Sequence, residues 1–187
     1  IGGNLLYNPG WMYGLDNWNT QNGGEWSTGL NLNADWTIGG SDARQGTAYI
    51  QQFGTTLTDK HLYLDTPNMI PVIPGQRYEA YVYTGAHRCT VSLWVDFKNG
   101  ADTVTSGRFD SDSNASEKSG GRNLANYKQV GMFFTVPADA VAARFVIRKQ
   151  GTDSPHGDSY MFCTMPYFGK AGINQTDYSQ WSEGTSG

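Results

Sequence analysis

Strict alternation of apolar and polar residues is the feature that most limits how this chain can fold. In the segment 89–97, CTVSLWVDF, every odd-numbered residue from Cys89 to Phe97 is apolar. The even-numbered residues are small or polar, except for Trp94. Side chains on a strand point alternately to opposite faces, so this pattern predicts a half-buried β-strand. The ring of Trp94 on the polar face indicates either a further covering layer or contact with a ligand.

Similar short segments recur along the whole chain, separated by clusters of Gly, Pro, Asn and Asp. We expect strands at 4–7, 25–30, 47–53, 60–65, 76–84, 89–97, 103–109, 128–136, 142–149 and 159–166. No convincing amphipathic helix interrupts them, and the 24 glycines suit many tight turns. The sequence therefore predicts an all-β fold, a β-sandwich of two antiparallel sheets.

The length of 187 residues suits one domain, spanning 1–187. Because the chain opens with Ile-Gly-Gly, which resembles a cut through a linker, we interpret it as a fragment of a larger protein. The net charge of -4 and the lack of a Lys/Arg cluster argue against a nucleic-acid partner. No apolar run approaches the ~20 residues of a membrane span, so we expect no membrane insertion.

The two cysteines, Cys89 and Cys163, each lie within an apolar strand-like segment. A chain of this length does not need a disulfide for stability, and free cysteine behaves as a small apolar side chain. We therefore expect two buried free thiols.

Two further segments repeat the alternation of 89–97. In 77–83 the residues Tyr78, Ala80 and Val82 share one face, and in 142–149 so do Ala143, Phe145 and Ile147. If these strands are neighbours, their opposite faces form one surface. That surface carries Arg77, Glu79, Tyr81, Tyr83, Trp94, Asp96, Arg144 and Arg148.

Such a surface suits a sugar, because flat rings stack on apolar C–H patches while charged and amide groups bond to hydroxyls. Trp94, Tyr83 and Tyr81 would form the stacking platform, and Asp96, Glu79 and the arginines would select among hydroxyl patterns. In the alternative interpretation, the rings are covered by a loop, for which 111–123 is the candidate, or by the polar final segment of the chain. We expect that final segment to pack along the domain without regular secondary structure.

A third possibility is a site at the loop end of the domain. Trp18, Trp26 and Trp36 lie in loop-rich sequence and could line such a site. Trp11 and Trp181, near the two ends of the chain, are expected to be packed anchors.

Catalytic and metal-binding patterns receive little support. His61, His87 and His156 lack metal-ligand spacing, and no Gly-x-Ser-x-Gly motif occurs. Glu79 and Asp96 could be proposed as a glycosidase pair, but with 17 acidic residues chance proximity explains them better. The acidic segment from Asp110 departs from a calcium loop, since Ala115 replaces its glycine and Gly121 its glutamate. We expect no catalytic activity, no bound metal and no cofactor.

The opening GNLLYNPGWMYGLDNW resembles the start of carbohydrate-binding modules of the family 4/9 type. These commonly begin with Asn-Leu-Leu, a short turn containing Gly, an aromatic residue and a segment ending in Trp. IPGQRYEAYVYT, VSLWVDFKNG and YKQVGMFFTVPADAVAARFVIR are similar to later strands of the same family, in the same order. The resemblance covers most of the chain and implies a jelly-roll β-sandwich that binds a glycan without catalysis.

The carboxyl end departs from the secreted members of that family, which can hold a structural calcium there. Met12 follows Trp11 where an acidic residue is usual, and the last strand reads CTMPYFGKAG, without Asp. The ending MPYFGKAGINQTDYSQWSEG instead resembles such modules in phage and prophage tail proteins, through Ser179 to Gly184 in particular.

The resemblance implies a non-catalytic carbohydrate-binding domain of a bacteriophage tail or tail-fibre protein, located in the virion tail. Its partners would be a host-surface polysaccharide and other tail domains. Two alternatives remain: a structural spacer within a tail assembly, or an accessory module of a secreted glycoside hydrolase.

Overall fold

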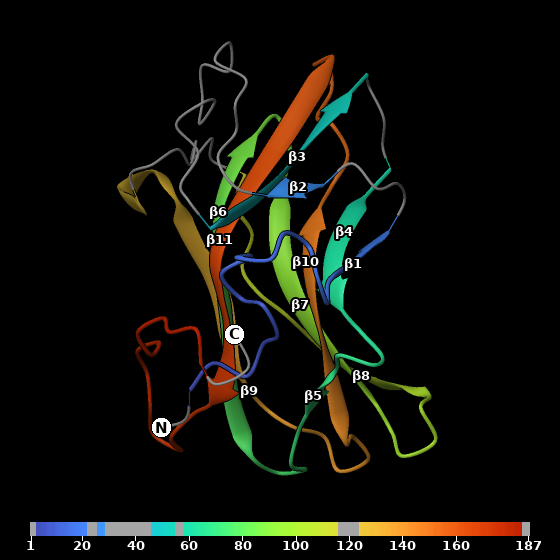
Figure 1. Cartoon of the computed structure of the whole chain (residues 1–187), viewed down its shortest axis with the longest axis vertical. Helices are drawn as coiled ribbons and strands as arrows, with labels where there is room; N and C mark the ends of the chain where they lie inside the picture. Colours follow the sequence, from blue (N-terminus) through green and yellow to red (C-terminus); the bar gives the residue numbers. More distant parts are fainter. Residues whose placement is uncertain (1–2, 22–25, 29–45, 55–57, 116–123, 185–187) are drawn as a thin grey trace.

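The computed structural model describes residues 3–21, 26–28, 46–54, 58–115 and 124–184. Two antiparallel sheets pack face to face, as Figure 1 shows. Among these residues the helical structure is limited to one short turn, η1 (Leu124–Asn126). The predicted all-β jelly-roll sandwich is confirmed. No helix in the described part of the chain is long and apolar enough to cross a membrane.

The first sheet, here called sheet A, has the strand order β1-β4-β10-β7-β8, and β5 also pairs with β10. Its strands are β1 (Asn19–Gln21), β4 (Lys60–Leu64), β5 (Ile70–Pro71), β7 (Val91–Lys98), β8 (Val104–Asp110) and β10 (Ala142–Lys149). Sheet B has the order β2-β3-β11-β6-β9. Its strands are β2 (Ser27–Thr28), β3 (Thr47–Phe53), β6 (Arg77–His87), β9 (Lys128–Thr135) and β11 (Asp158–Lys170).

The predicted strand positions agree best where alternation is strongest. Segments 47–53 and 142–149 coincide with β3 and β10. The prediction for 4–7 is wrong: this segment forms no strand, although the Leu5 N–H donates to the Phe168 carbonyl (2.8 Å).

β11 continues past Pro166, where the sequence suggested an end. A register shift between Thr164 and Tyr167, with Met165 at a φ of 55°, accommodates the proline, which has no N–H to donate. The shift lets the strand run on to Lys170.

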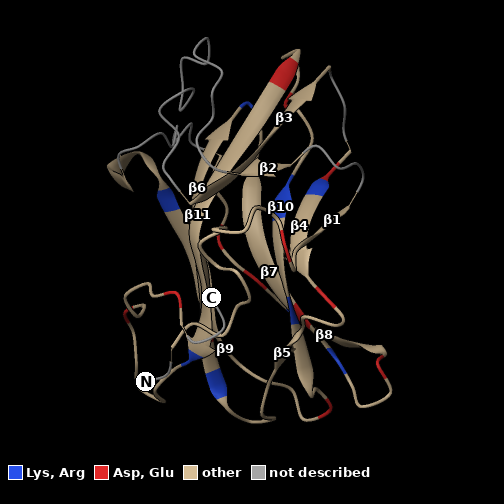
Figure 2. Ribbon diagram, viewed as in Figure 1, with Lys and Arg blue, Asp and Glu red and all other residues tan. Residues whose placement is uncertain are grey.

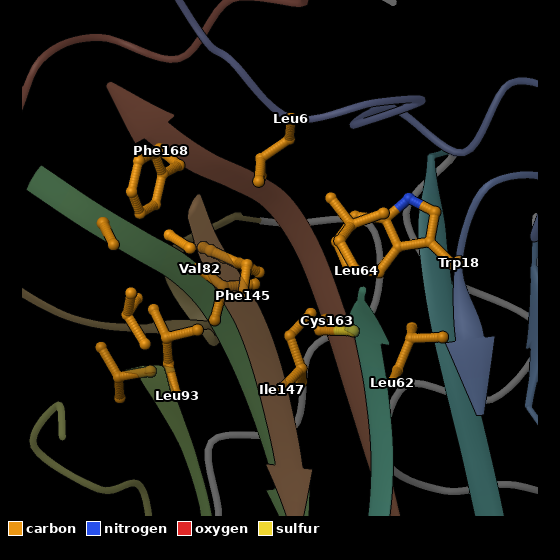
Figure 3. Close-up of a cluster of buried hydrophobic side chains, with 14 of the residues drawn as sticks. Leu6, Trp18, Leu62, Leu64, Val82, Leu93, Phe145, Ile147, Cys163 and Phe168 are labelled. Atoms are coloured by element: carbon orange, nitrogen blue, oxygen red, sulfur yellow. The ribbon is translucent and has the colours of Figure 1, made fainter. Parts of the chain in front are cut away.

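The inward faces predicted from alternation form the core between the sheets. All five odd-numbered residues from Cys89 to Phe97 are buried, as are Phe145 and Ile147 of β10. Figure 3 shows side chains of both sheets, such as Leu93 and Cys163, turned toward one another. Cys89 and Cys163 are buried and free, so the expectation of two free thiols is confirmed.

The predicted loop-end site loses two of its three tryptophans to this core. Trp18 is 7% exposed and Trp26 is 4% exposed, and both pack against core residues (Figure 3 shows Trp18). The Trp18 Nε1–H donates to the Tyr7 carbonyl (2.9 Å). Trp36 lies outside the described residues. The loop-end interpretation is therefore wrong for Trp18 and Trp26, because loop-rich sequence can still carry an inward-facing ring.

The two terminal tryptophans behave as expected. Trp11 is buried in the core, with its ring centroid 5.3 Å from that of Trp18. Trp181 is half-buried, and its Nε1–H donates to the Pro166 carbonyl (2.8 Å) beside the β11 bulge.

Candidate functional site

The eight predicted site residues do not form one surface. Arg77, Glu79, Tyr81 and Tyr83 lie on β6 in sheet B, whereas Trp94, Asp96, Arg144 and Arg148 lie on β7 and β10 in sheet A. The expectation of a single surface is therefore wrong. Alternation distinguishes inward from outward residues, but it does not specify which sheet a strand joins, and the chain changes sheets between β6 and β7. This separation also places Glu79 and Asp96 on opposite sides of the sandwich, so they cannot act together as a catalytic pair.

The outer face of sheet B is covered by the segment 172–183, here called the C-terminal strap. Figure 1 shows this red segment looping back beside the sheet after β11. Glu79 has no exposed surface and binds the strap through its carboxylate. The Ser179 N–H and Oγ–H donate to its two oxygens (2.6 Å each), and Gln175 Nε2 donates to Oε2 (2.8 Å).

Arg77 and Tyr81 hold the same strap. Arg77 Nη1 donates to the carbonyls of Gly172 (2.6 Å) and Gln175 (2.7 Å). The Tyr81 hydroxyl donates to the Ser179 carbonyl (2.8 Å), and its ring is stacked on Tyr167 at 5.1 Å. Burial raises the pKa of Tyr81. On this sheet the covering alternative applies, and the expected irregular packing of the final segment is observed.

Tyr83 lies at the edge of this covered region. It is half-buried, contacts the Tyr81 ring edge-on at 5.8 Å, and packs against a small cluster formed by Tyr127, Tyr160 and Phe162. These contacts give the Tyr83 ring a packing role.

The outer face of sheet A has no such cover among the described residues, and strand register arranges its side chains in rows. One row runs from His61 on β4 to Arg148 on β10 and Ser92 on β7. The next runs from Tyr63 through Val146 to Trp94 and ends at Asp110 on β8. Residues directly opposite one another in an antiparallel pair lie on the same face, so these side chains share one surface.

A small groove of about 80 Å³ lies at the centre of this surface. Its lining residues are Gln21, His61, Tyr63, Trp94, Arg144 and Val146. Val146 is 3% exposed although it points outward, because the larger side chains around it cover it. The groove thus combines an apolar residue and aromatic rings with polar side chains.

Arg144 is fixed at the groove by carboxylates. Its Nε and Nη2 donate to the two oxygens of Asp96 (2.6 and 2.5 Å), and its Nη1 lies 3.5 Å from Asp65 Oδ2. The bond to Asp96 raises the pKa of Arg144. Two parallel hydrogen bonds to one carboxylate hold the guanidinium plane in a fixed orientation. The pair therefore presents a preformed hydrogen-bonding edge.

The other cations of this surface also have partners. Arg148 bonds to Asp59 (2.7 Å), and Lys98 lies 3.0 Å from Asp65. Arg108 Nη2 donates to Asp110 (2.8 Å). Figure 2 shows acidic and basic positions interspersed around β7, β8 and β10. Each of these positive charges on the sheet A surface is thus neutralised by a neighbouring carboxylate.

Trp94 is held between two other side chains. The Arg108 guanidinium lies 4.0 Å from its ring centroid, and the His61 ring contacts it edge-on, with centroids 4.8 Å apart. Arg108 therefore occupies part of the stacking surface that we expected Trp94 to offer. Trp94 Nε1 is buried and has no hydrogen-bond partner within the described ranges.

His61 is the second ring of the groove with an unpaired nitrogen. Its Nδ1 lies 2.8 Å from Gln21 Oε1, while its Nε2 is buried without a partner in the described chain. Burial, and to a smaller extent Arg148 and Arg108, lower the pKa of His61 despite the opposing charge of Asp59. His61 is consequently neutral near pH 7.

Sequence reasoning missed His61, Tyr63, Gln21 and Arg108 as parts of this surface. Residues 60–64, KHLYL, show the same alternation as β7, with His61 and Tyr63 on the outward side. Applying the face analysis to this segment would have found them. Arg108 joins this surface because it lies on β8 directly opposite Asp96 of β7, a pairing that only the strand register reveals.

A larger hollow of about 360 Å³ lies elsewhere, between the N-terminal loop, the β11 bulge and the end of the strap. It is lined by Gly10, Met12, Gly46, Thr164, Met165, Trp181 and Glu183. It contains one aromatic ring and one carboxylate, and Gly46 adjoins chain that is not described. We therefore place the candidate site in the sheet A groove. No group of three or more potential metal ligands gathers anywhere in the described chain.

No protein-family model matches the chain, and no curated protein sequence matches it. Solved structures do share its fold. TmCBM61 in complex with β-1,4-galactotriose is 10% identical with a TM-score of 0.52, over 90% of this chain and 99% of that one. The chain has the β-sandwich fold of carbohydrate-binding modules.

Two longer proteins contain the same fold as one part of their chains. The CBM22-1 and GH10 modules of Clostridium thermocellum xylanase 10B, complexed with xylohexaose, match at 12% identity and a TM-score of 0.56. The enzymatically active domain of tailspike protein 4 of bacteriophage CBA120 matches at 13% identity and a TM-score of 0.58. Our chain aligns over 96% and 90% of its length, but spans only 30% and 21% of those proteins.

Proposed function

We propose that this chain is a non-catalytic carbohydrate-binding domain and that its ligand lies across the groove of sheet A. The observation that carries the proposal is the composition of that groove. On the uncovered face of the sandwich, the aromatic rings of Tyr63 and Trp94 meet the outward apolar side chain of Val146. The bidentate Arg144–Asp96 pair lies beside them. A sugar ring presents C–H patches and hydroxyls that match these two kinds of group.

The fold comparisons support this proposal because two of the similar structures were solved with bound oligosaccharides. Of the predicted site residues, Trp94, Asp96, Arg144 and Arg148 remain in the proposal. Tyr63, His61, Gln21 and Val146 are added to them. Arg77, Glu79 and Tyr81 are removed because they bind the strap.

The parent protein that we propose is a bacteriophage tail or tail-fibre protein, with a host-surface polysaccharide as the ligand. The ending from Ser179 to Gly184 resembles tail proteins, and a tailspike contains the same fold. A shallow groove of about 80 Å³ supports only weak single-site binding, which repeated copies in a tail would strengthen through avidity.

Two rival functions follow from specific observations. A module of a glycoside hydrolase is favoured by the match to xylanase 10B. A structural interaction domain is favoured by Met12 and Tyr13, which are 62% and 67% exposed and line a hollow of about 130 Å³. The interaction-domain alternative does not explain why aromatic and hydrogen-bonding groups gather on sheet A. The hydrolase-module alternative shares the proposed carbohydrate binding and differs in the parent protein.

The test is a binding screen of the domain against β-1,4-galactotriose, xylohexaose and purified bacterial surface polysaccharides. Tyr63→Ala and Trp94→Ala change the groove, and Tyr83→Ala is the matched control on the other sheet. We expect the two groove variants to lower affinity about tenfold or more, as loss of a central aromatic contact does. The control should bind like the wild type.

The same screen can refute the proposal in two ways. Binding that survives both groove substitutions but is lost in Tyr83→Ala would move the site to sheet B. If the folded wild-type domain binds none of the carbohydrates, the interaction-domain alternative replaces glycan binding.

A further inference from the structure

Two buried ring nitrogens in the groove lack hydrogen-bond partners within the described residues. They are Trp94 Nε1 and His61 Nε2, and both side chains line the groove. An unpaired buried polar atom costs about 1–3 kcal/mol, and native proteins contain few of them. Trp11 Nε1, Trp26 Nε1 and Thr105 Oγ1 are also buried without a partner in the described chain. His61 and Trp94 differ in that their rings contact each other and line one groove, which points to a ligand that bonds to both atoms.

The two atoms have opposite hydrogen-bonding character. The Trp94 indole nitrogen can only donate. In His61 the near neighbour of Nδ1 is the carbonyl oxygen of the Gln21 side chain, an acceptor at 2.8 Å. The proton of the neutral ring therefore lies on Nδ1, and Nε2 has a free lone pair that accepts.

A hydroxyl group complements this arrangement because it accepts and donates at one oxygen. The two rings are 4.8 Å apart between centroids and nearly perpendicular, at 84°. We propose that one hydroxyl of the bound sugar accepts from Trp94 Nε1–H and donates to His61 Nε2, so that binding requires neutral His61. This inference rests on the proposed function and adds a pH dependence to it.

Because both atoms are buried in the free protein, a covering side chain must move when the ligand binds. Arg108 is positioned to be that side chain, with its guanidinium 4.0 Å from the Trp94 ring centroid. It is 42% exposed and bonds to Asp110, two residues away on the same strand. Exposed ion pairs of this kind contribute little to stability, so displacing Arg108 costs little free energy.

The charged groups around His61 determine the direction of the pH effect. Asp59 directly precedes β4 and is paired with Arg148 on β10. Another nearby charge is Arg108 on β8. Gln21 on β1 is neutral, and Tyr63 lies on β4 with His61. Burial lowers the pKa of His61, Asp59 opposes this, and the two arginines add to it. The pKa therefore lies below the ordinary 6.5. Affinity should be constant above it and should fall as the pH drops through it, because Nε2 then becomes a second donor.

The experiment measures affinity for the tightest-binding oligosaccharide of the screen by calorimetry, from about pH 5 to about pH 8. We expect wild-type affinity to fall at least about fivefold once the pH is one unit below the pKa of His61. His61→Gln keeps an acceptor but does not titrate, so its affinity should be independent of pH. His87→Gln on sheet B is the matched control and should keep the wild-type pH dependence.

Trp94→Phe separates this role from a structural one. The change removes the unpaired N–H but keeps most of the ring, so we expect affinity at pH 7.5 to fall about five- to tenfold. The melting temperature should stay the same or rise, because an unsatisfied buried N–H disappears.

Each outcome identifies which inference fails. Wild-type binding that is independent of pH, together with wild-type affinity in Trp94→Phe, would overturn the paired-ring inference and leave glycan binding intact. Absence of wild-type binding at every pH would overturn both. A ¹⁵N NMR spectrum that places the proton of neutral His61 on Nε2 would overturn the acceptor assignment without any ligand.

Discussion

The carboxylate of Glu79 is fully buried on a face that alternation alone assigns to solvent. Its three bonds to the strap come from Ser179 and Gln175 (2.6 to 2.8 Å). Removing it would leave these donors without an acceptor in a covered location. We expect Glu79→Ala to lower the free energy of unfolding by about 3 kcal/mol, measured by urea denaturation.

The matched control for Glu79 is Glu183→Ala, since Glu183 is exposed at the end of the same strap. Its effect should stay within about 0.5 kcal/mol. Glycan affinity should be unchanged in both variants. Normal stability of Glu79→Ala combined with lost glycan binding would contradict the structural role and return Glu79 to the ligand site.

At the scale of elements, the strap acts as a third layer on sheet B. Tyr178 stacks on Phe133 of β9 at 5.0 Å and contacts Tyr81 of β6 at 5.4 Å, while Arg77 lies 4.4 Å from the Phe133 ring centroid. Gly131 permits the close pairing of β9 with β6 beneath the strap, because a Cβ there would lie 2.5 Å from the Ala80 carbonyl oxygen and 2.7 Å from the Cβ of Tyr81. The strap therefore covers rings that would otherwise form an exposed aromatic patch.

Deleting residues 172–187 tests that assignment. We expect the truncated domain to melt at a lower temperature and to bind a hydrophobic dye, because Tyr81, Tyr167 and Phe133 become exposed. The groove on sheet A should still bind its glycan with wild-type affinity below the new melting temperature. If truncation creates glycan binding or increases it, sheet B is a ligand face that the strap blocks.

The strands also show which features of the fold can be predicted from the sequence and which cannot. Alternation placed the inward side chains of β6, β7 and β10 correctly, since it follows from strand geometry alone. It could not assign β6 to the opposite sheet, because that depends on pairing with β11, distant in the chain. The predicted single surface is therefore divided between the two sheets: Trp94, Asp96, Arg144 and Arg148 lie on sheet A, whereas Arg77, Glu79, Tyr81 and Tyr83 lie on sheet B.

Across the whole molecule, one buried lysine connects the two sheets. Lys149 of β10 has no exposed surface and donates to Gln52 of β3, to Ser159 Oγ of β11 (2.7 Å) and to the Gln150 carbonyl (3.1 Å). These partners are neutral, so the ammonium is satisfied by hydrogen bonds without a contacting carboxylate. Burial lowers the pKa of Lys149 below its ordinary 10.5.

This buried cation should give the sandwich a pH-dependent stability on the alkaline side. Between the lowered pKa and 10.5 the unfolded chain binds more protons than the folded one, so the free energy of unfolding rises with pH. Lys149→Met removes that titration and keeps a similar volume. We expect the wild type to gain stability relative to Lys149→Met as the pH rises to about 10, in urea denaturation at a series of pH values. Lys170→Met, an exposed control on β11, should follow the wild type. Parallel profiles for the wild type and Lys149→Met would mean that the ammonium is as well stabilised between the sheets as in water.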